Sequence, residues 1–404
     1  MPIYDNLLEL IRNPSGFELS NHINVNKIDS LVRKNVIIIV SEHISFKSHG
    51  GGYIIRDLLL DGLMNCGYET IFIDDPKEFF TIVNANICRI SFIFVFQSIM
   101  DIGWLYNKNI IDMYTIFDRL KDFEIGRYPK NIPSLFFNSK VYYKMMEDHY
   151  PQFSMPKSQT IFYPVWDEIF YEEYEKNILT RLDELKELGH NTAVLKKGFS
   201  GEKHGRRFVK LTGETEEYKK VIKSLEYTDD MDMYTKNGPY DKGGFRIVII
   251  QPFNKVISKR ENEYKMWYLN KKFTGMYHVG SKTILYHHDT PLFNKLKAFG
   301  DDIVNKFVKD LCKDVPDILR VDISWVTKES LLDDDSFKLD GTRMRLYLNE
   351  IEIQPTFFFK NIIHHHDGKK EYTDKYQREV CRTWFIELYE HTGNGKILDV
   401  IKKL

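Results

Sequence analysis

Short apolar runs alternate with amphipathic segments in the first third of the chain. VIIIV (36–40) is apolar at every position, as in a strand buried on both faces. The turn HGGG (49–52) follows, and YIIRDLLLDGLMNCG (53–67) has helical apolar spacing and a glycine stop. Two further strand-like runs are YETIFID (68–74) and ISFIFVFQ (90–97). Strands that alternate with helices predict an α/β section with a parallel sheet.

The pattern changes in the rest of the chain. The segment 138–190 has the charge and apolar spacing of a helical connection, and further helices are predicted over 291–312 and 373–393. The polar stretch 327–343 is predicted to loop out from a hairpin. The strand-like segments of this half are NTAVLKKG (191–198), GRRFVKL (205–211), GGFRIVIIQPF (243–253), EYKMWYLNKKFTGMYHVG (263–280), ILRVDISWV (318–326) and MRLYLNEIEIQ (344–354).

Composition narrows the class of protein. The chain has 404 residues, enough for two or three domains, and its net charge of −1 gives no general attraction to nucleic acid or anionic membrane. It has no apolar run of the roughly 20 residues that a membrane span needs, and MPIYDNLLELIRN lacks the features of a secretory signal. Its four cysteines form no CxxC pair. We therefore expect a soluble, cytoplasmic protein without nucleic-acid or membrane partners, and a homodimer stays open.

Two carboxylates share one face of an otherwise apolar strand. Glu350 and Glu352 alternate with Ile351 and Ile353, and successive side chains of a strand point to opposite faces. Antiparallel pairing with the preceding strand would bring Asp322 beside them. Such oxygen clusters suit Mg²⁺, which relieves the repulsion between like charges. The plain alternative is a solvated face of an antiparallel sheet, where alternation of this kind is common.

A lysine and a glycine-rich loop lie upstream. Lys196 is near the end of a predicted strand, and Gly198 and Gly201 follow it. Backbone N–H groups of such a loop can cover phosphates while the lysine supplies a charge. Because the lysine precedes the glycines, this is not the P-loop, and glycines between strands often only turn the chain. A later apolar strand ends at Gln251, and Glu263 follows it.

Taken in order, these segments resemble the ATP-grasp superfamily, and their motif forms are most similar to those of the D-alanine–D-alanine ligase branch. The resemblance covers about 130–360 and implies an ATP-grasp fold after a Rossmann-like α/β domain. The matching segments are NSK (138–140), PKSQT (156–160), AVLKKGFSG (193–201), IIQPF (249–253), NEYK (262–265), RVD (320–322) and LNEIEIQP (348–355).

The resemblance also implies a division of the chain. Residues 1–135 would form the N-terminal pre-ATP-grasp domain. Residues 136–255 would form the smaller, central subdomain with the glycine loop. Residues 256–404 would form the metal-binding and catalytic subdomain.

The resemblance further assigns a role to each site residue. Catalysis is assigned to Arg320 and Lys196. Mg²⁺, as one ion or two and with Mn²⁺ able to replace it, is assigned to Asp322, Glu350 and Glu352. ATP binding is assigned to Lys140, Lys196, Gly198, Ser200, Gly201, Gln251, Pro252, Phe253 and Glu263. The sequence departs from the family where Glu352 replaces the usual asparagine and Lys197 the usual proline.

The activity implied is that of a carboxylate–amine or carboxylate–thiol ligase. It would form an acyl phosphate from ATP and a small carboxylate, and an amine would then displace phosphate. The substrate is expected near Glu42, His49, Gly50, Gly51, Gly52 and Arg320. A small-molecule kinase is the first alternative. A nucleotide-sugar glycosyltransferase, suggested by HGGG, or a non-catalytic nucleotide-binding module is the second.

Overall fold

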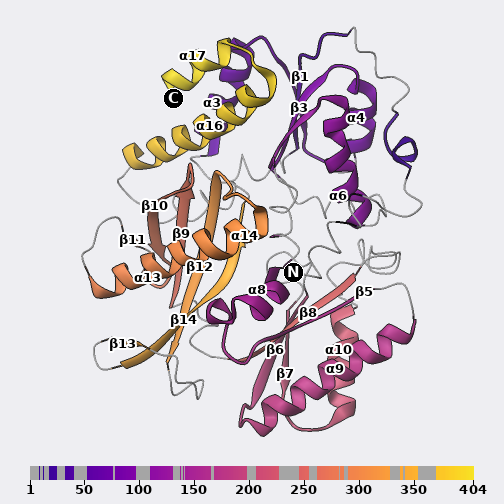
Figure 1. Cartoon of the computed structure of the whole chain (residues 1–404), viewed down its shortest axis with the longest axis vertical. Coiled ribbons are helices and arrows are strands. Elements are labelled where there is room, and N and C mark those ends of the chain that lie inside the picture. Colours follow the sequence, from indigo (N-terminus) through magenta and orange to yellow (C-terminus); the bar gives the residue numbers. More distant parts are fainter. Residues whose placement is uncertain are drawn as a thin grey trace.

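The structure, a computed structural model, contains three sheets, one in each predicted part of the chain (Figure 1). No helix among the described residues is long and apolar enough to cross a membrane. The structure describes residues 9, 12, 18–24, 32–40, 52–75, 78–96, 110–130, 137, 140, 142–164, 168–197, 206–226, 245–253, 262–281, 283–285, 290–327, 337–339, 342–353 and 370–404.

The N-terminal sheet is parallel, with the strand order β2-β1-β3-β4. β1 is buried at all five positions, as expected for a central parallel strand with helices on both sides. The predicted α/β character is therefore confirmed. The elements are β1 (Val36–Val40), α3 (Gly52–Asn65), β2 (Glu69–Ile73), α4 (Phe79–Asn86), β3 (Ile90–Val95), α6 (Ile110–Arg119) and β4 (Gly126–Tyr128).

The C-terminal helices pack against this N-terminal section. α16 (Lys370–Thr392) contacts α3 and β4, and α17 (Lys396–Lys403) contacts α3 (Figure 1). Phe385 of α16 shares one apolar core with Leu59 and Leu63 of α3. The two ends of the described chain thus form one packed unit, although the sequence division assigns them to different parts.

The middle sheet is antiparallel, with the order β5-β8-β6-β7. One face packs its alternate apolar residues, among them Leu195 and Ile250, against two helices. The other face carries Lys196, Ile249 and Gln251. Ile249 belongs to the core shared with the large sheet, so this face points toward that sheet. The elements are β5 (Gln159–Pro164), α9 (Glu168–Glu187), β6 (Thr192–Lys197), β7 (Arg206–Lys210), α10 (Thr215–Glu226) and β8 (Phe245–Pro252).

Part of the predicted helical connection is a strand. The segment 138–190 contains α8 (Tyr142–His149) and α9, but β5 lies between them as an edge strand on β8. Glu147 of α8 fixes the start of this strand, because its carboxylate accepts hydrogen bonds from the Thr160 N–H at 2.6 Å and the Thr160 hydroxyl at 2.9 Å. Because these contacts join two separate elements, the spacing of apolar residues within 138–190 did not predict β5.

The large sheet is antiparallel, with the order β11-β10-β9-β12-β14-β13. Val321, Ile323 and Ile351 lie on its apolar face, in one core with residues of α13 (Pro291–Asp302) and the π-helical segment η8 (Ile303–Val308). The strands are β9 (Glu263–Leu269), β10 (Lys272–His278), β11 (Thr283–Leu285), β12 (Ile318–Thr327), β13 (Phe337–Leu339) and β14 (Thr342–Glu352). Residues 337–339 of the predicted polar loop therefore form a short strand.

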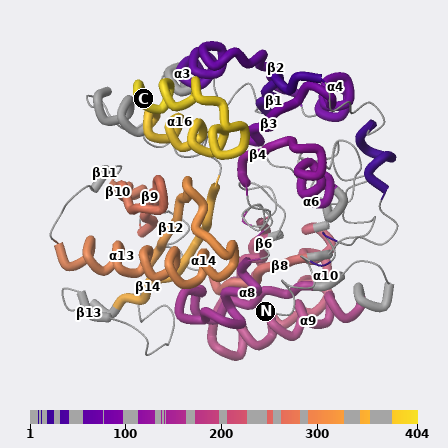
Figure 2. The backbone as a smooth tube through the Cα atoms, turned by 45° about the horizontal axis from the view of Figure 1, so that its top comes forward, coloured from indigo at the N-terminus to yellow at the C-terminus, as the bar shows by residue number. Residues whose placement is uncertain are grey.

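The middle and large sheets lie next to one another, and the N-terminal sheet with α16 lies across from both (Figure 2). α8 precedes both the middle and the large sheet in sequence, but it contacts both in space: it packs on β5, and its Tyr142 hydroxyl accepts a hydrogen bond from the Ile351 N–H of β14. Polar side chains from two separate sheets can therefore meet.

Candidate nucleotide and metal site

The polar residues of β12 and β14 meet on one sheet face. In the antiparallel register Asp322 lies opposite Glu350, and Arg320 lies opposite Glu352. On the other side of β12, Lys265 of β9 lies opposite Asp322. Directly opposed residues share a face, so these five side chains form one cluster, here called the carboxylate face. The pairing expected from the sequence is confirmed.

Asp322 is fully buried, and cations hold both of its oxygens. Arg320 donates from Nε to Oδ1 at 2.7 Å and from Nη2 to Oδ2 at 3.0 Å, while the Lys265 ammonium lies 2.5 Å from Oδ2. Burial alone would raise the pKa of Asp322, but the charges of Arg320 and Lys265 hold it below its ordinary value. Asp322 is therefore an anion that fixes the orientation of the guanidinium.

Glu350 and Glu352 are less well compensated. The Arg320 Nη2 atom is 3.9 Å from Glu350 and 4.0 Å from Glu352, at the outer limit of an ion pair. Burial and the neighbouring Glu350 charge raise the pKa of Glu352 to about 8. Glu350 is also one third exposed, so an incoming ion can reach it. These two carboxylates form a site that a cation would stabilise.

The residues fit a hard cation only in part. Within the described ranges, no three His, Cys, Asp or Glu side chains are arranged as a metal cage. Mg²⁺ seldom needs such a cage, because it keeps waters and binds substrate phosphates through one or two carboxylates. Glu350 and Glu352 meet that requirement, whereas both oxygens of the expected ligand Asp322 are bound to Arg320 and Lys265.

Lys196 reaches the same place from the middle sheet. Burial and the nearby Lys140 lower its pKa to about 8, while the charges of Glu350 and Glu263 oppose that shift. Lys196 thus lies within electrostatic range of both sheets. Lys140 has a left-handed backbone (φ 58°) just ahead of α8, where its carbonyl accepts a hydrogen bond from the Tyr143 N–H at 3.0 Å. Lys140 therefore lies near Lys196, and the phosphate contacts expected of both lysines stay predictions.

A bulge and two tyrosines position Glu350. Asp322 pairs with Glu350 but Ile323 pairs with Leu348, so Asn349 is the extra residue on β14. Tyr143 donates its hydroxyl proton to the Asn349 carbonyl, and the Tyr142 hydroxyl accepts from the Ile351 N–H at 3.2 Å. α8 is thereby joined to β14 on either side of Glu350.

An aromatic surface lies beside the end of β8, where Gln251 and Pro252 were expected to meet adenine. The Phe253 N–H donates to the Thr192 carbonyl at 2.8 Å, and its ring meets Phe208 edge-on at 5.3 Å between centroids. Phe208 is 49% exposed, and the Arg206 guanidinium lies 5.2 Å from its ring centre. A single half-exposed ring is common on protein surfaces, so it is the position of Phe208 on the face of Lys196 that makes it a candidate ligand contact.

Sequence reasoning overlooked Phe208 and Arg206, although a signal was present. The register places Phe208 opposite Val194 and Arg206 opposite Lys196, so all four side chains share one face of the middle sheet. Alternation in RRFVK shows that Arg206 and Phe208 point to the same side. Only the pairing with β6 shows that this is the side of Lys196.

Several expected site residues lie outside the described residues. Gly52 is described as the first residue of α3. Glu263 is buried, with Oε1 3.0 Å from the Lys265 ammonium, and its expected ribose contact stays a prediction. The expected residues that the structure does not describe are Gly198, Ser200, Gly201, Glu42, His49, Gly50 and Gly51.

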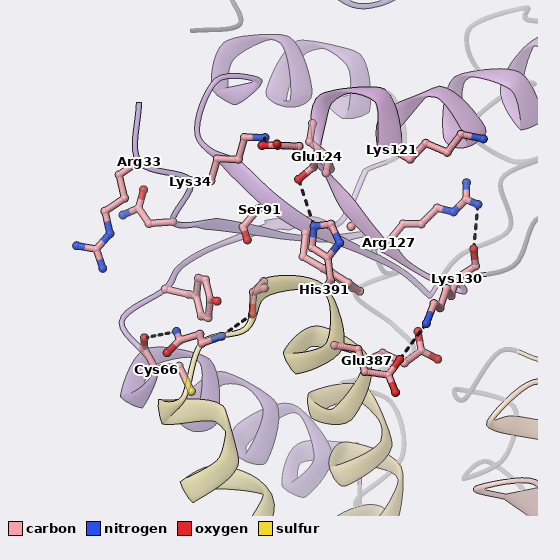
Figure 3. A pocket seen from close by; sticks show the side chains of 18 of the residues that line it. Arg33, Lys34, Cys66, Ser91, Lys121, Glu124, Arg127, Lys130, Glu387 and His391 are labelled. Atoms are coloured by element: carbon pink, nitrogen blue, oxygen red, sulfur yellow. Dashed lines mark hydrogen bonds and ion pairs between the residues drawn. The ribbon is translucent and has the colours of Figure 1, made fainter. Parts of the chain in front are cut away.

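A hollow of about 890 Å³ lies at the edge of the N-terminal sheet where β1, β3 and β4 begin (Figure 3). The C-terminal part of α16 forms one wall with Glu387, Glu390 and His391. Glu387 is 8% exposed, and its Oε2 atom has no hydrogen-bond partner among the described residues. The lining includes none of the residues expected to bind ATP or metal.

Glu387 should make stability depend on pH. Burial and the charge of Asp317 raise its pKa from 4.5 to about 8. Between these values the unfolded chain releases the proton that the folded chain keeps, so stability falls as pH rises. We expect Glu387→Gln to gain stability relative to the wild type between pH 5 and 8, by roughly a few kcal/mol. Urea unfolding at several pH values measures this. If the difference in unfolding free energy between Glu387→Gln and the wild type stays constant across that range, the expectation is contradicted. The exposed Glu216→Gln is the control.

No protein-family model matches the sequence, and no curated protein matches it significantly. Among solved structures, D-cycloserine synthetase DcsG is 12% identical, with 86% of this chain and 98% of that chain covered and a TM-score of 0.49. D-alanine–D-alanine ligase from Bacillus anthracis, complexed with ATP, is 14% identical, with 91% and 95% covered and a TM-score of 0.44. ATP-grasp ligase PsnB, complexed with precursor peptide PsnA2 and AMPPNP, is 10% identical, with 87% and 99% covered and a TM-score of 0.37. Each of these is a distant similarity, with a TM-score below 0.5.

Proposed function

We propose that the chain is an ATP- and Mg²⁺-dependent ligase that joins a small carboxylate to an amine through an acyl phosphate. The observation that carries this proposal is the carboxylate face, where Arg320, Glu350 and Glu352 meet Lys196 from a second sheet. Lys196, with Lys140 near it and Glu350 within electrostatic range, suits a triphosphate and its cation. The order of the sequence motifs supports the ATP-grasp assignment independently.

ATP would bind between the middle and large sheets. Lys140 and Lys196 would hold the phosphates, since the two lysines lie near one another and Lys196 is within electrostatic range of Glu350. Adenine would lie against Phe208 and the strand end at Gln251–Phe253, with Glu263 on the ribose. Gly198, Ser200 and Gly201 would cover the phosphates from the loop after β6. The triphosphate would thereby point toward Glu350.

Glu350 and Glu352 would hold Mg²⁺. Asp322 would act indirectly, by fixing the positions of the Arg320 guanidinium and the Lys265 ammonium. When bound, the cation would offset charge on the β- and γ-phosphates during phosphoryl transfer. The raised pKa of Glu352 would return toward its ordinary range, because a divalent cation favours the ionised form.

Arg320 would serve the second half of the reaction. The substrate carboxylate attacks the γ-phosphorus, and the bond from this phosphorus to the ADP oxygen breaks. The amine then attacks the acyl carbon, and inorganic phosphate leaves. A guanidinium held rigidly by Asp322 can stabilise the oxyanion of that step without reorganising. Glu42 and His49 to Gly52 are proposed to contact the substrate.

The proposal is tested by ADP release in a panel of amino acids and small carboxylates, with hydroxylamine as the amine. A ligase forms a hydroxamate in step with ADP, because hydroxylamine intercepts the acyl phosphate. A kinase releases ADP and leaves a stable phosphate ester without hydroxamate. Binding of a nucleotide sugar without turnover of ATP would instead favour the glycosyltransferase.

Phe208 provides a test of the adenine position. We expect Phe208→Ala to weaken binding of a non-hydrolysable ATP analogue about tenfold, ~1.4 kcal/mol, by removing a stacking surface. Stability should change little, since the ring is half exposed. Calorimetry measures the affinity, and Met64→Ala, at an exposed apolar residue of α3, is the matched control. Equal affinity of Phe208→Ala and the wild type for the analogue would show that adenine does not contact this surface.

A further inference from the structure

Lys265 is an unexpected feature of the carboxylate face. Its ammonium lies 2.5 Å from Asp322 and 3.0 Å from Glu263, so it bridges carboxylates on two neighbouring strands. The side chain is only 6% exposed. A buried lysine is costly unless it is paired, and here two carboxylates pair with it. Lys265 is thus a fixed cation within the sheet.

The charges of the carboxylate face, together with Glu263 beside it, can be counted. Glu263, Asp322, Glu350 and Glu352 contribute four negative charges when ionised, and Arg320 and Lys265 contribute two positive ones. Two negative charges remain among these six side chains, with Lys196 of the middle sheet left to the phosphates that it is proposed to hold. The two charges belong to Glu350 and Glu352, whose distances from Arg320 are at the outer limit of an ion pair. One divalent cation would neutralise that remainder.

The position of Lys265 decides where a cation can bind. Asp322 lies across β12 from Lys265 and is fully buried. Its Oδ2 atom already meets Lys265 and Arg320, and its Oδ1 atom meets Arg320. A metal on Asp322 would lie beside an ammonium that is itself held by Glu263. The repulsion between two such cations favours only one of them.

We propose that Lys265 takes the place of a second divalent cation, so that this site binds a single metal ion, on Glu350 and Glu352. The inference rests on the proposed function, because it concerns the metal that would accompany ATP. Lys265 is in this view a positioning residue. It keeps Asp322 ionised and in place for Arg320 without needing a metal there.

The experiment counts Mn²⁺ ions bound to the full chain at saturating non-hydrolysable ATP analogue, by the electron paramagnetic resonance signal of free Mn²⁺. The wild type should bind one Mn²⁺ per bound nucleotide. Lys265→Met should bind two, since Asp322 and Glu263 lose their shared cation. Lys265→Arg should return to one, because it restores the charge. Lys271→Met, which breaks the exposed pair with Asp314, should stay at one.

Two Mn²⁺ ions per nucleotide in the wild type would overturn the inference while leaving the proposed function intact. One ion in a folded Lys265→Met would also overturn it, since Lys265 would then be a structural ion-pair partner only. If Lys265→Met does not fold, the wild type and Lys265→Arg decide, and a second ion in Lys265→Arg counts against the inference. Failure of the wild type to bind nucleotide and Mn²⁺ together would reject the proposed function and this inference with it.

Discussion

Glu350→Gln is expected to reduce ATP turnover by at least about 100-fold, or ~2.7 kcal/mol of transition-state stabilisation. The change removes the negative charge of the more exposed carboxylate in the pair and leaves its size almost unchanged. Without Glu350, the proposed cation would keep Glu352 alone as a directly coordinating protein ligand. Turnover is measured as ADP release with the carboxylate found by screening.

The fold should survive Glu350→Gln, because the residue is one third exposed and relief of its repulsion with Glu352 removes a cost. Thermal unfolding checks this, and the exposed Glu216→Gln on α10 should keep full turnover. Wild-type turnover in a folded Glu350→Gln variant would show that the metal does not bind at this face.

Arg320→Lys should reduce product formation by roughly 100-fold or more while changing the affinity for an ATP analogue by less than about threefold. Lysine keeps one charge beside Asp322 but loses the two-point contact that Nε and Nη2 make at 2.7 and 3.0 Å. The oriented donor for the oxyanion is lost with it. Single-turnover kinetics and calorimetry separate the two effects.

Alanine is a poorer choice at Arg320. It would leave the fully buried Asp322 with Lys265 alone, and breaking a buried pair costs ~3–5 kcal/mol of stability. Arg382→Lys, at a partly exposed pair with Glu379 away from the carboxylate face, is the matched control and should behave as the wild type. A parallel loss of ATP affinity and product formation in Arg320→Lys would mean that Arg320 does not serve the acyl intermediate.

Strong periodicity predicted much of this fold. VIIIV (36–40) became a central parallel strand because every position is apolar. The alternation around Glu350 predicted both the strand and its polar face. The pairing of Glu350 with Asp322 was predicted because the two strands follow one another in sequence. Lys140 and Lys196 were proposed from motif order, since they share no local pattern, and their roles stay predictions.

Features that depend on distant contacts were not predicted. β5 is a strand because it pairs with β8 and is fixed by Glu147, about a dozen residues upstream. Lys265 was read only as part of a motif, because its partner Asp322 becomes its neighbour only when β9 lies beside β12. The same holds for Phe208, whose face is set by β6. α16 gave no sequence signal that it would join the N-terminal core.

The most direct measurement is a crystal structure of the chain with Mg²⁺ and a non-hydrolysable ATP analogue. The account predicts adenine beside Phe208 and the strand end at Phe253, phosphates between Lys140 and Lys196, and the metal on Glu350 and Glu352. Nucleotide bound elsewhere, such as in the hollow beside Glu387, or phosphates and metal without contact to Lys196 and Glu350, would contradict it.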